Sequence, residues 1–199
     1  MNAFYIVIII LQIGVIVYFV RQSRLKRKLI AEKAAMTPEN TYTELRRLAL
    51  NVTPYQLKLA IPNSETFIYG IVMDWDMGDV TVTLTAYITG ACSMYLNTGG
   101  GFVKGGQNPV VAETAVEFVT LAKDYIDLAV PGTTTDLPAK DCVRFYFLTN
   151  QRMYMVEEQM SNFDDDSSPL LPFFEQANVV ISGMRRSGNG VLANQNDKA

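Results

Sequence analysis

The chain has 199 residues, a formal net charge of −3, 49% hydrophobic residues and no histidine. The absence of histidine excludes Ser-His and Cys-His catalysis and removes the commonest zinc ligand. Two cysteines, Cys92 and Cys142, are too few for a disulfide-rich domain, and in the cytoplasm they would stay reduced. This composition favours a non-enzymatic protein, and we expect neither a cofactor nor a metal site.

Residues 3–20 form an apolar run in which Gln12 is the only polar side chain. As an α-helix this run would be about 27 Å long, close to the roughly 30 Å hydrocarbon core of a bilayer. A cleaved signal would need basic residues before a shorter apolar core, and the sequence has neither. The sequence therefore predicts a single-pass transmembrane anchor over residues 1–20.

Basic residues follow the apolar run. Residues 21–33 carry six Lys or Arg and one Glu, a net charge of +5, so the total of −3 leaves −8 for the remainder. The basic flank of an anchor stays in the cytoplasm, which predicts a domain on the cytoplasmic side of a bacterial inner membrane. The basic stalk over residues 21–40 is either a topology signal alone or also a lipid contact, made by Arg21, Arg24, Lys26, Arg27 and Lys28.

The acidic remainder is long enough for one soluble domain, which we place at residues 41–186, followed by a disordered tail at 187–199. Its net negative charge disfavours a nucleic-acid partner, because phosphate contacts need clustered Lys and Arg. The predicted partners are the lipid bilayer and either another protein or a second copy of the chain.

Periodicity predicts the elements of this domain. A short helix is expected from Thr41 to Asn51, followed by three strands: a short apolar run at 67–73, and two segments at 80–86 and 92–97 in which apolar and polar residues alternate. A one-sided helix follows, with Asn108 as its N-cap and Pro109 at its first position.

Two further strands are expected at 143–148 and 152–158, and a last helix begins near Ser168, which we expect to cap it. The order of elements predicts an α+β domain with a five-stranded antiparallel sheet. Helices on one face would bury the apolar side of the sheet.

A glycine-rich segment joins the third strand to the helix at Pro109. Such a loop before a helix can turn backbone N–H groups toward an anion, and Lys104 would add positive charge. It lacks both the Walker pattern and the dinucleotide fingerprint. The segment is therefore either a ligand or partner loop or a closely packed crossover, and its candidate residues are Thr98, Gly99, Gly100, Gly101, Lys104, Gly105, Gly106 and Asn108.

The same segment carries a resemblance to known proteins. Together with the Tyr-Gly-Ile-Val-Met-Asp stretch at 69–74 and Val-Arg-Phe-Tyr at 143–146, it resembles a family of uncharacterised small bacterial proteins with a Thr-Gly-Gly-Gly and Gly-Gly loop. The succession of elements is more loosely similar to profilin-like, longin-like and roadblock-like modules. This resemblance implies a bacterial origin and a common domain, and it supplies no catalytic residue.

Acidic residues at Asp74, Asp76 and Asp79 surround Trp75, and we interpret them as a solvated hairpin tip rather than a metal site. The sequence thus supports two functional hypotheses. The first is a membrane-tethered, non-enzymatic interaction or sensing module that binds a protein partner or itself. The alternative is a nucleotide- or phosphometabolite-binding domain, with or without enzyme activity, that uses the loop at residues 99–106.

Overall fold

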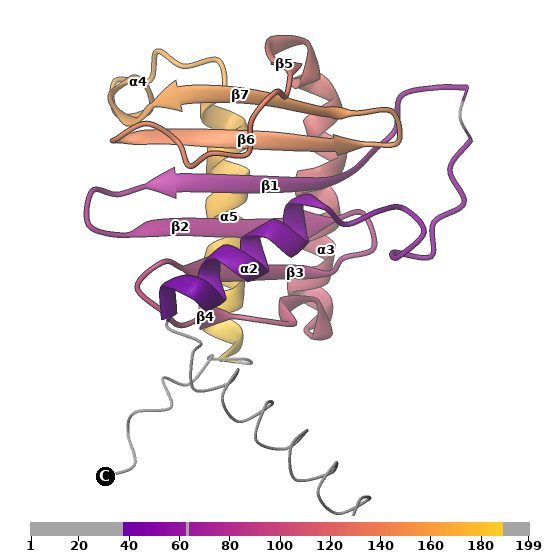
Figure 1. The fold of residues 1–199 in the computed structure, drawn as a ribbon, viewed down its shortest axis with the longest axis horizontal. Helices are drawn as coiled ribbons and strands as arrows, with labels where there is room; N and C mark the ends of the chain where they lie inside the picture. The colour runs from indigo at the N-terminus through magenta and orange to yellow at the C-terminus, as the bar shows by residue number, and fades with distance from the viewer. Residues whose placement is uncertain (1–37, 63, 189–199) are drawn as a thin grey trace, which may run out of the picture. The chain divides into compact units, whose positions relative to one another are not determined.

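A seven-stranded antiparallel sheet is the framework of residues 38–62 and 64–188, which this computed structural model describes. Its strands lie side by side in the order β4-β3-β2-β1-β6-β7-β5 (Figure 1). The prediction of five strands is wrong, because two more strands extend the sheet. The strands are β1 Ile68–Asp76, β2 Thr81–Tyr87, β3 Cys92–Leu96, β4 Gly101–Phe102, β5 Val130–Pro131, β6 Cys142–Thr149 and β7 Met153–Gln159.

The two additional strands, β4 and β5, are the edges of the sheet and are only two residues long. β4 pairs with the second half of β3, and β5, which contains Pro131, pairs with β7. A two-residue strand has no alternation to detect in the sequence. Short edge strands and proline hinder the addition of a strand from another chain, so both edges of this sheet are protected.

Helices lie on both faces of the sheet. α3 (Pro109–Leu121) and α5 (Leu171–Ser187) cover one face, and α2 (Pro38–Leu50) crosses the other (Figure 1). The expectation of helices on one face alone is therefore also wrong. The remaining helices of the described residues are short: α4 Met160–Asp164 and three 3-10 turns, η1 Gly105–Gln107, η2 Ala122–Asp124 and η3 Ile126–Leu128.

Successive side chains along each strand point to opposite faces of the sheet, so each face has its own hydrophobic core. In β1, Ile71 and Met73 join the core under α3 and α5, whereas Val72 joins the core under α2. Phe173 of α5 is fully buried, with its ring centroid 4.6 Å from that of Phe118 on α3. The α2 face is more polar, and its buried apolar residues are Ala49, Leu50, Tyr69, Val72, Tyr87, Tyr146 and Leu148.

Helix starts follow local capping chemistry. Asn108 caps α3 as predicted, because its side-chain oxygen accepts hydrogen bonds from the backbone N–H groups of Val110 and Val111 at 3.0 and 3.4 Å. The predicted cap at Ser168 is wrong, because Leu170 occupies the N-cap position of α5. The Ser168 hydroxyl accepts instead from the backbone N–H of Leu170 and donates to Glu158.

We expect Asn108→Ala to lower the free energy of unfolding by about 0.5–2 kcal/mol, the usual effect of losing an N-cap side chain. Urea denaturation of the full chain measures this change. Asn108→Ser keeps a side-chain acceptor and is the matched control, with a smaller loss. Equal losses in the two variants would show that the cap hydrogen bonds do not stabilise α3.

The predicted membrane placement also needs correction. Within residues 38–62 and 64–188 no helix is both long and apolar enough to cross a bilayer. The proposed anchor at residues 1–20, and the basic residues Arg21, Arg24, Lys26, Arg27 and Lys28, lie outside the described residues. The described residues therefore do not bear out the predicted single-pass placement, and it is not proposed further.

Candidate functional site

The glycine-rich segment runs along the β3 edge of the sheet. After the turn at Thr98, the chain forms β4, turns at Lys104 with a φ of +59°, and passes through η1 to the cap of α3. Because β4 and η1 give the segment regular structure, it is not a long free loop.

Close packing explains why glycine, rather than a larger residue, occupies several positions of the glycine-rich segment. Gly101 has a φ of +140°, and a Cβ there would collide with the carbonyl oxygen of Met94 on β3. At Gly105 a Cβ would lie 2.8 Å from both the Cys92 sulfur and the Met184 side chain. These glycines let the segment approach the sheet edge and α5. Of the two readings of the sequence, close packing accounts for Gly101 and Gly105.

A groove of about 520 Å³ lies between this segment and α2. α2 and the turn after it form one wall, with Leu45, Leu48 and Val52, and β2 and β3 form the floor. Lys104, Gly106 and Gln107 complete the opposite wall. The remaining lining residues are Ala49, Thr85, Tyr87, Thr89, Ala91, Cys92, Ser93 and Tyr95.

The structure therefore divides the predicted site residues into two groups. Lys104 and Gly106 line the groove, whereas the other six lie outside its lining: Thr98, Gly99, Gly100, Gly101, Gly105 and Asn108. Leu48 of α2 is 49% exposed on the groove wall. The sequence does not reveal this wall, because α2 and the glycine-rich segment are far apart in the chain.

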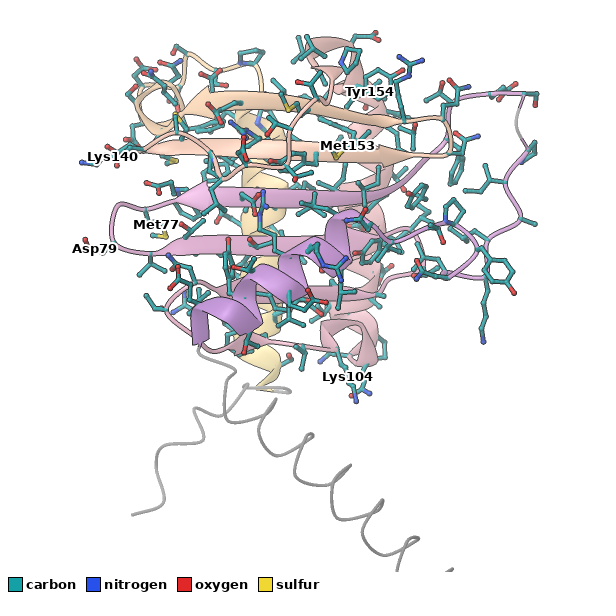
Figure 2. The ribbon with its side chains drawn as sticks, in the orientation of Figure 1. Met77, Asp79, Lys104, Lys140, Met153 and Tyr154 are labelled. Carbon is teal, nitrogen blue, oxygen red and sulfur yellow. The ribbon has the colours of Figure 1, made fainter. Side chains whose placement is uncertain are left out.

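The residues of the groove floor carry no charge. Lys104, on the wall opposite α2, is the positively charged residue of the groove lining. Burial raises the pKa of the Cys92 thiol to about 11, so this thiol stays protonated at neutral pH. The Tyr87 hydroxyl, whose pKa is also raised by burial, donates to the backbone carbonyl of Ala49. Lys104 is exposed at the lower edge of the domain in Figure 2, and the ion pairs of the described residues do not include it.

A buried ion pair beneath α2 is the other chemically notable feature. The Arg46 guanidinium donates from Nε and from Nη2 to Asp74 Oδ2, at 2.9 and 2.6 Å. The Asp74 side chain is fully buried in the middle of the sheet face, and Thr83 donates to its other oxygen at 2.5 Å. The prediction that Asp74 belongs to a solvated hairpin tip is wrong. Asp79 lies at that turn, beside Met77 (Figure 2), and Asp76, the last residue of β1, accepts a hydrogen bond from the backbone N–H of Gly78 in the turn.

Strand register places Asp74 in a row of polar residues that crosses the sheet from strand to strand. Pairing of β3, β2, β1, β6 and β7 aligns Tyr95, Thr83, Asp74, Arg144 and Glu157. These five polar residues lie on five different strands and form no motif in the sequence. They become neighbours only because the strands pair in this register.

Side chains of this face also form hydrogen bonds to the loop between β5 and β6. Arg144 donates to the carbonyl of Asp136 at 2.8 Å and pairs with Glu157 at 2.5 Å. The Tyr146 hydroxyl donates to the same carbonyl, and Arg46 reaches the carbonyl of Thr135 at 2.5 Å. Every buried side-chain nitrogen and oxygen within the described residues has a hydrogen-bond partner, including those of this network.

Unfolding at alkaline pH tests whether the tyrosines on the α2 face of the sheet are buried. Burial, and then the charge of Asp74, raise the pKa of Tyr42 from 10.0 to about 12, and burial raises the pKa of Tyr69, Tyr87 and Tyr146. Between pH 10 and 12 the unfolded chain therefore holds fewer protons than the native chain, and the free energy of unfolding falls as pH rises.

We expect the absorbance of tyrosinate from these residues to appear together with unfolding, measured in parallel by circular dichroism. In Tyr42→Phe the fall in stability above pH 10 should be shallower. Ionisation of all tyrosines at pH 10 with an unchanged circular dichroism spectrum would contradict the burial of this face.

The described residues show neither a metal-binding cluster nor a reactive cysteine. The described residues contain no cluster of three Cys, Asp or Glu side chains arranged to hold a metal ion. Cys92 and Cys142 are free and buried, and neighbouring carboxylates add to burial in raising the pKa of Cys142. Neither thiol is activated as a nucleophile.

The chain matches no known protein-family model, no curated protein and no solved structure. The resemblance to small bacterial proteins with a glycine-rich loop therefore stays a prediction.

Proposed function

We propose that this domain is a non-enzymatic interaction module that binds a segment of another protein in the groove between α2 and the segment at residues 104–107. The observation that carries the proposal is the exposed apolar wall of α2 facing a positive side chain. Leu45, Leu48 and Val52 stand opposite Lys104 across a neutral floor.

The chemistry of the groove defines its occupant. Contact with the leucine wall removes apolar surface from water at about 25 cal/mol per Å². Floor groups such as Ser93 and Tyr95 can hydrogen-bond a peptide backbone, and Lys104 attracts a carboxylate. The expected partner segment is therefore short and apolar, with an Asp or Glu near one end.

The buried network supports a binding role over a catalytic one. Asp74 is the most deeply buried carboxylate of the α2 face, and Arg46 and Thr83 already occupy its oxygens. General acid or base catalysis needs a titrating group within hydrogen-bond reach of a substrate. Asp74 instead fixes α2 on the sheet, which keeps the groove wall in place.

The alternative of a nucleotide or phosphometabolite at residues 99–106 has less support. Gly101 and Gly105 approach protein atoms, so their lack of a side chain has a structural reason. The positive charge of Lys104 is the one feature that favours this alternative. A thermal-shift series with nucleotides tests it, because ligand at 100 times its dissociation constant stabilises the native state by about 2.7 kcal/mol.

Selection from a displayed peptide library tests the proposed function. The full chain is the target, and Leu48→Glu and Leu128→Glu are counter-targets, since these leucines are 49% and 46% exposed at different places. We expect apolar peptides with an acidic residue that lose binding to Leu48→Glu and keep it for Leu128→Glu. Peptides that bind both variants equally well, or no enrichment, would contradict the proposal.

A further inference from the structure

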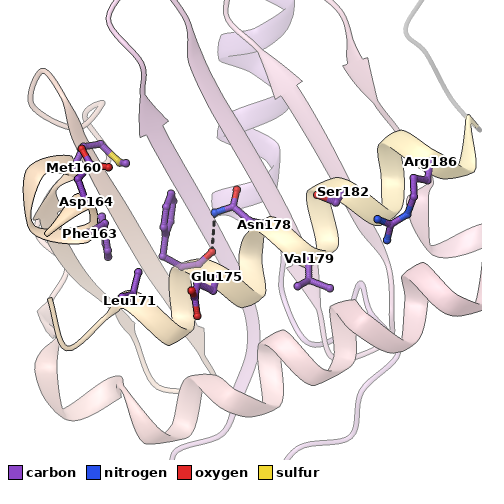
Figure 3. Close-up of a pocket in the computed structure, with 10 residues that line it drawn as sticks. Met160, Phe163, Asp164, Leu171, Glu175, Asn178, Val179, Ser182 and Arg186 are labelled. Atoms are coloured by element: carbon purple, nitrogen blue, oxygen red, sulfur yellow. Dashed lines mark hydrogen bonds between the residues drawn. The ribbon is translucent and has the colours of Figure 1, made fainter. Parts of the chain in front are cut away.

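A second groove, of about 600 Å³, lies along α5 (Figure 3). Its floor is apolar at the end where α5 begins, where the rings of Phe163 and Phe174 stack with centroids 4.5 Å apart. Met160 and Leu171 lie beside them, and Arg186 lies at the other end (Figure 3). Asn178, Val179 and Ser182 line the stretch between.

Charges of opposite sign mark the two ends of this groove. Asp164 and Glu175 are exposed beside the aromatic floor, and Arg186 is exposed eleven residues after Glu175, about 16 Å along the helix. None of the three belongs to the ion pairs of the described residues. An aromatic floor with two carboxylates beside it suits a guanidinium group, whose methylene stem packs on rings while its head pairs with carboxylates.

We propose that a second copy of the chain occupies this groove through its own α5, in an antiparallel arrangement. A two-fold axis passing between Val179 and Ser182 places Arg186 of each copy near Glu175 and Asp164 of the other. The same surface thus supplies both the arginine and its receptor, which is the requirement for an isologous dimer.

Two further features support a second copy as the occupant. Val179, near the proposed axis, is 42% exposed, and the neighbouring Asn178 and Ser182 are small enough for two helices to approach. The blunted edges β4 and β5 disfavour association by strand pairing, so a helical face is the available surface. This surface is separate from the groove beside α2.

Sedimentation velocity of the full-length chain tests the proposal with charge reversals. Glu175→Arg and Arg186→Glu should each weaken self-association at least about tenfold, because each places like charges opposite one another twice. An equimolar mixture of the two variants should regain most of the association of the unchanged chain, since both contacts between positions 175 and 186 in the mixed dimer are then of opposite sign and only one of the two contacts with Asp164 is repulsive. Glu113→Arg and Lys123→Glu, exposed on and just after α3, are matched controls that should associate normally.

A monomeric full-length chain, single reversals without effect, or a mixture that stays as weak as its components would each overturn the proposal. A chain that ends at Gly188 should associate as the full chain does. Loss of association in that variant would show that residues 189–199, rather than a second α5, occupy the groove.

Discussion

Arg46→Met is expected to lower the free energy of unfolding by about 3–5 kcal/mol, because it leaves the buried Asp74 carboxylate without its counter-charge. The same change removes the donor that reaches the carbonyl of Thr135, so the loop before β6 should loosen as well. Urea denaturation measures the loss of stability, and hydrogen exchange of residues 133–137 measures the loosening.

The neighbouring arginine provides the control. Arg47 pairs with Glu44 on the surface of α2, where their side chains are 58% and 48% exposed. Arg47→Met should change stability little, since exposed ion pairs contribute little. Similar losses in the Arg46 and Arg47 variants would show that helix propensity or packing of α2, rather than the buried pair, sets the effect.

Gly101→Ala is expected to destabilise the chain by about 2–6 kcal/mol, since backbone strain and overpacking each cost about 1–3 kcal/mol. Its φ of +140° disfavours a side chain, and the new methyl group would press on the backbone of Met94 and Tyr95. Thermal and urea denaturation of the full chain measure the loss.

Gly78→Ala separates the contribution of backbone strain from that of overpacking. Gly78 also has a positive φ, of +86°, but a Cβ there would have no neighbour within 4 Å. We therefore expect only the strain term, about 1–2 kcal/mol, in this variant. If Gly101→Ala were no worse than Gly78→Ala, close packing of the glycine-rich segment on β3 would be contradicted.

Local patterns in the sequence predicted the five longer strands and the start of α3. Alternation in Val82, Leu84 and Ala86 marks a strand that has one apolar face, and Asn108-Pro109 is a specific helix-start signal. The edge strands were missed because Gly101-Phe102 and Val130-Pro131 are too short for any periodicity. The position of α2 on the opposite face was missed because Tyr42 and Arg46 are buried by polar contacts, and hydrophobic spacing does not report these.

The candidate site was predicted only in part for a similar reason. Lys104 and Gly106 were identified from the glycine pattern, but the wall that faces them comes from Leu45 and Leu48, far away in the chain. Asp74 looked like a turn residue because two further aspartates follow it. Only the register of β1 against β2 and β6 places it beside Thr83 and Arg144, and register depends on pairing between distant segments.

Photo-crosslinking in cells that produce the full chain tests the central claim, that the groove beside α2 binds another protein. A photoreactive residue replaces Leu48 in one variant and the equally exposed Leu128 in another. We expect an adduct of defined mass from position 48 that disappears when Lys104→Glu is added, and no such adduct from position 128. Adducts of the same mass from both positions, or an adduct at position 48 that Lys104→Glu leaves unchanged, would contradict the claim.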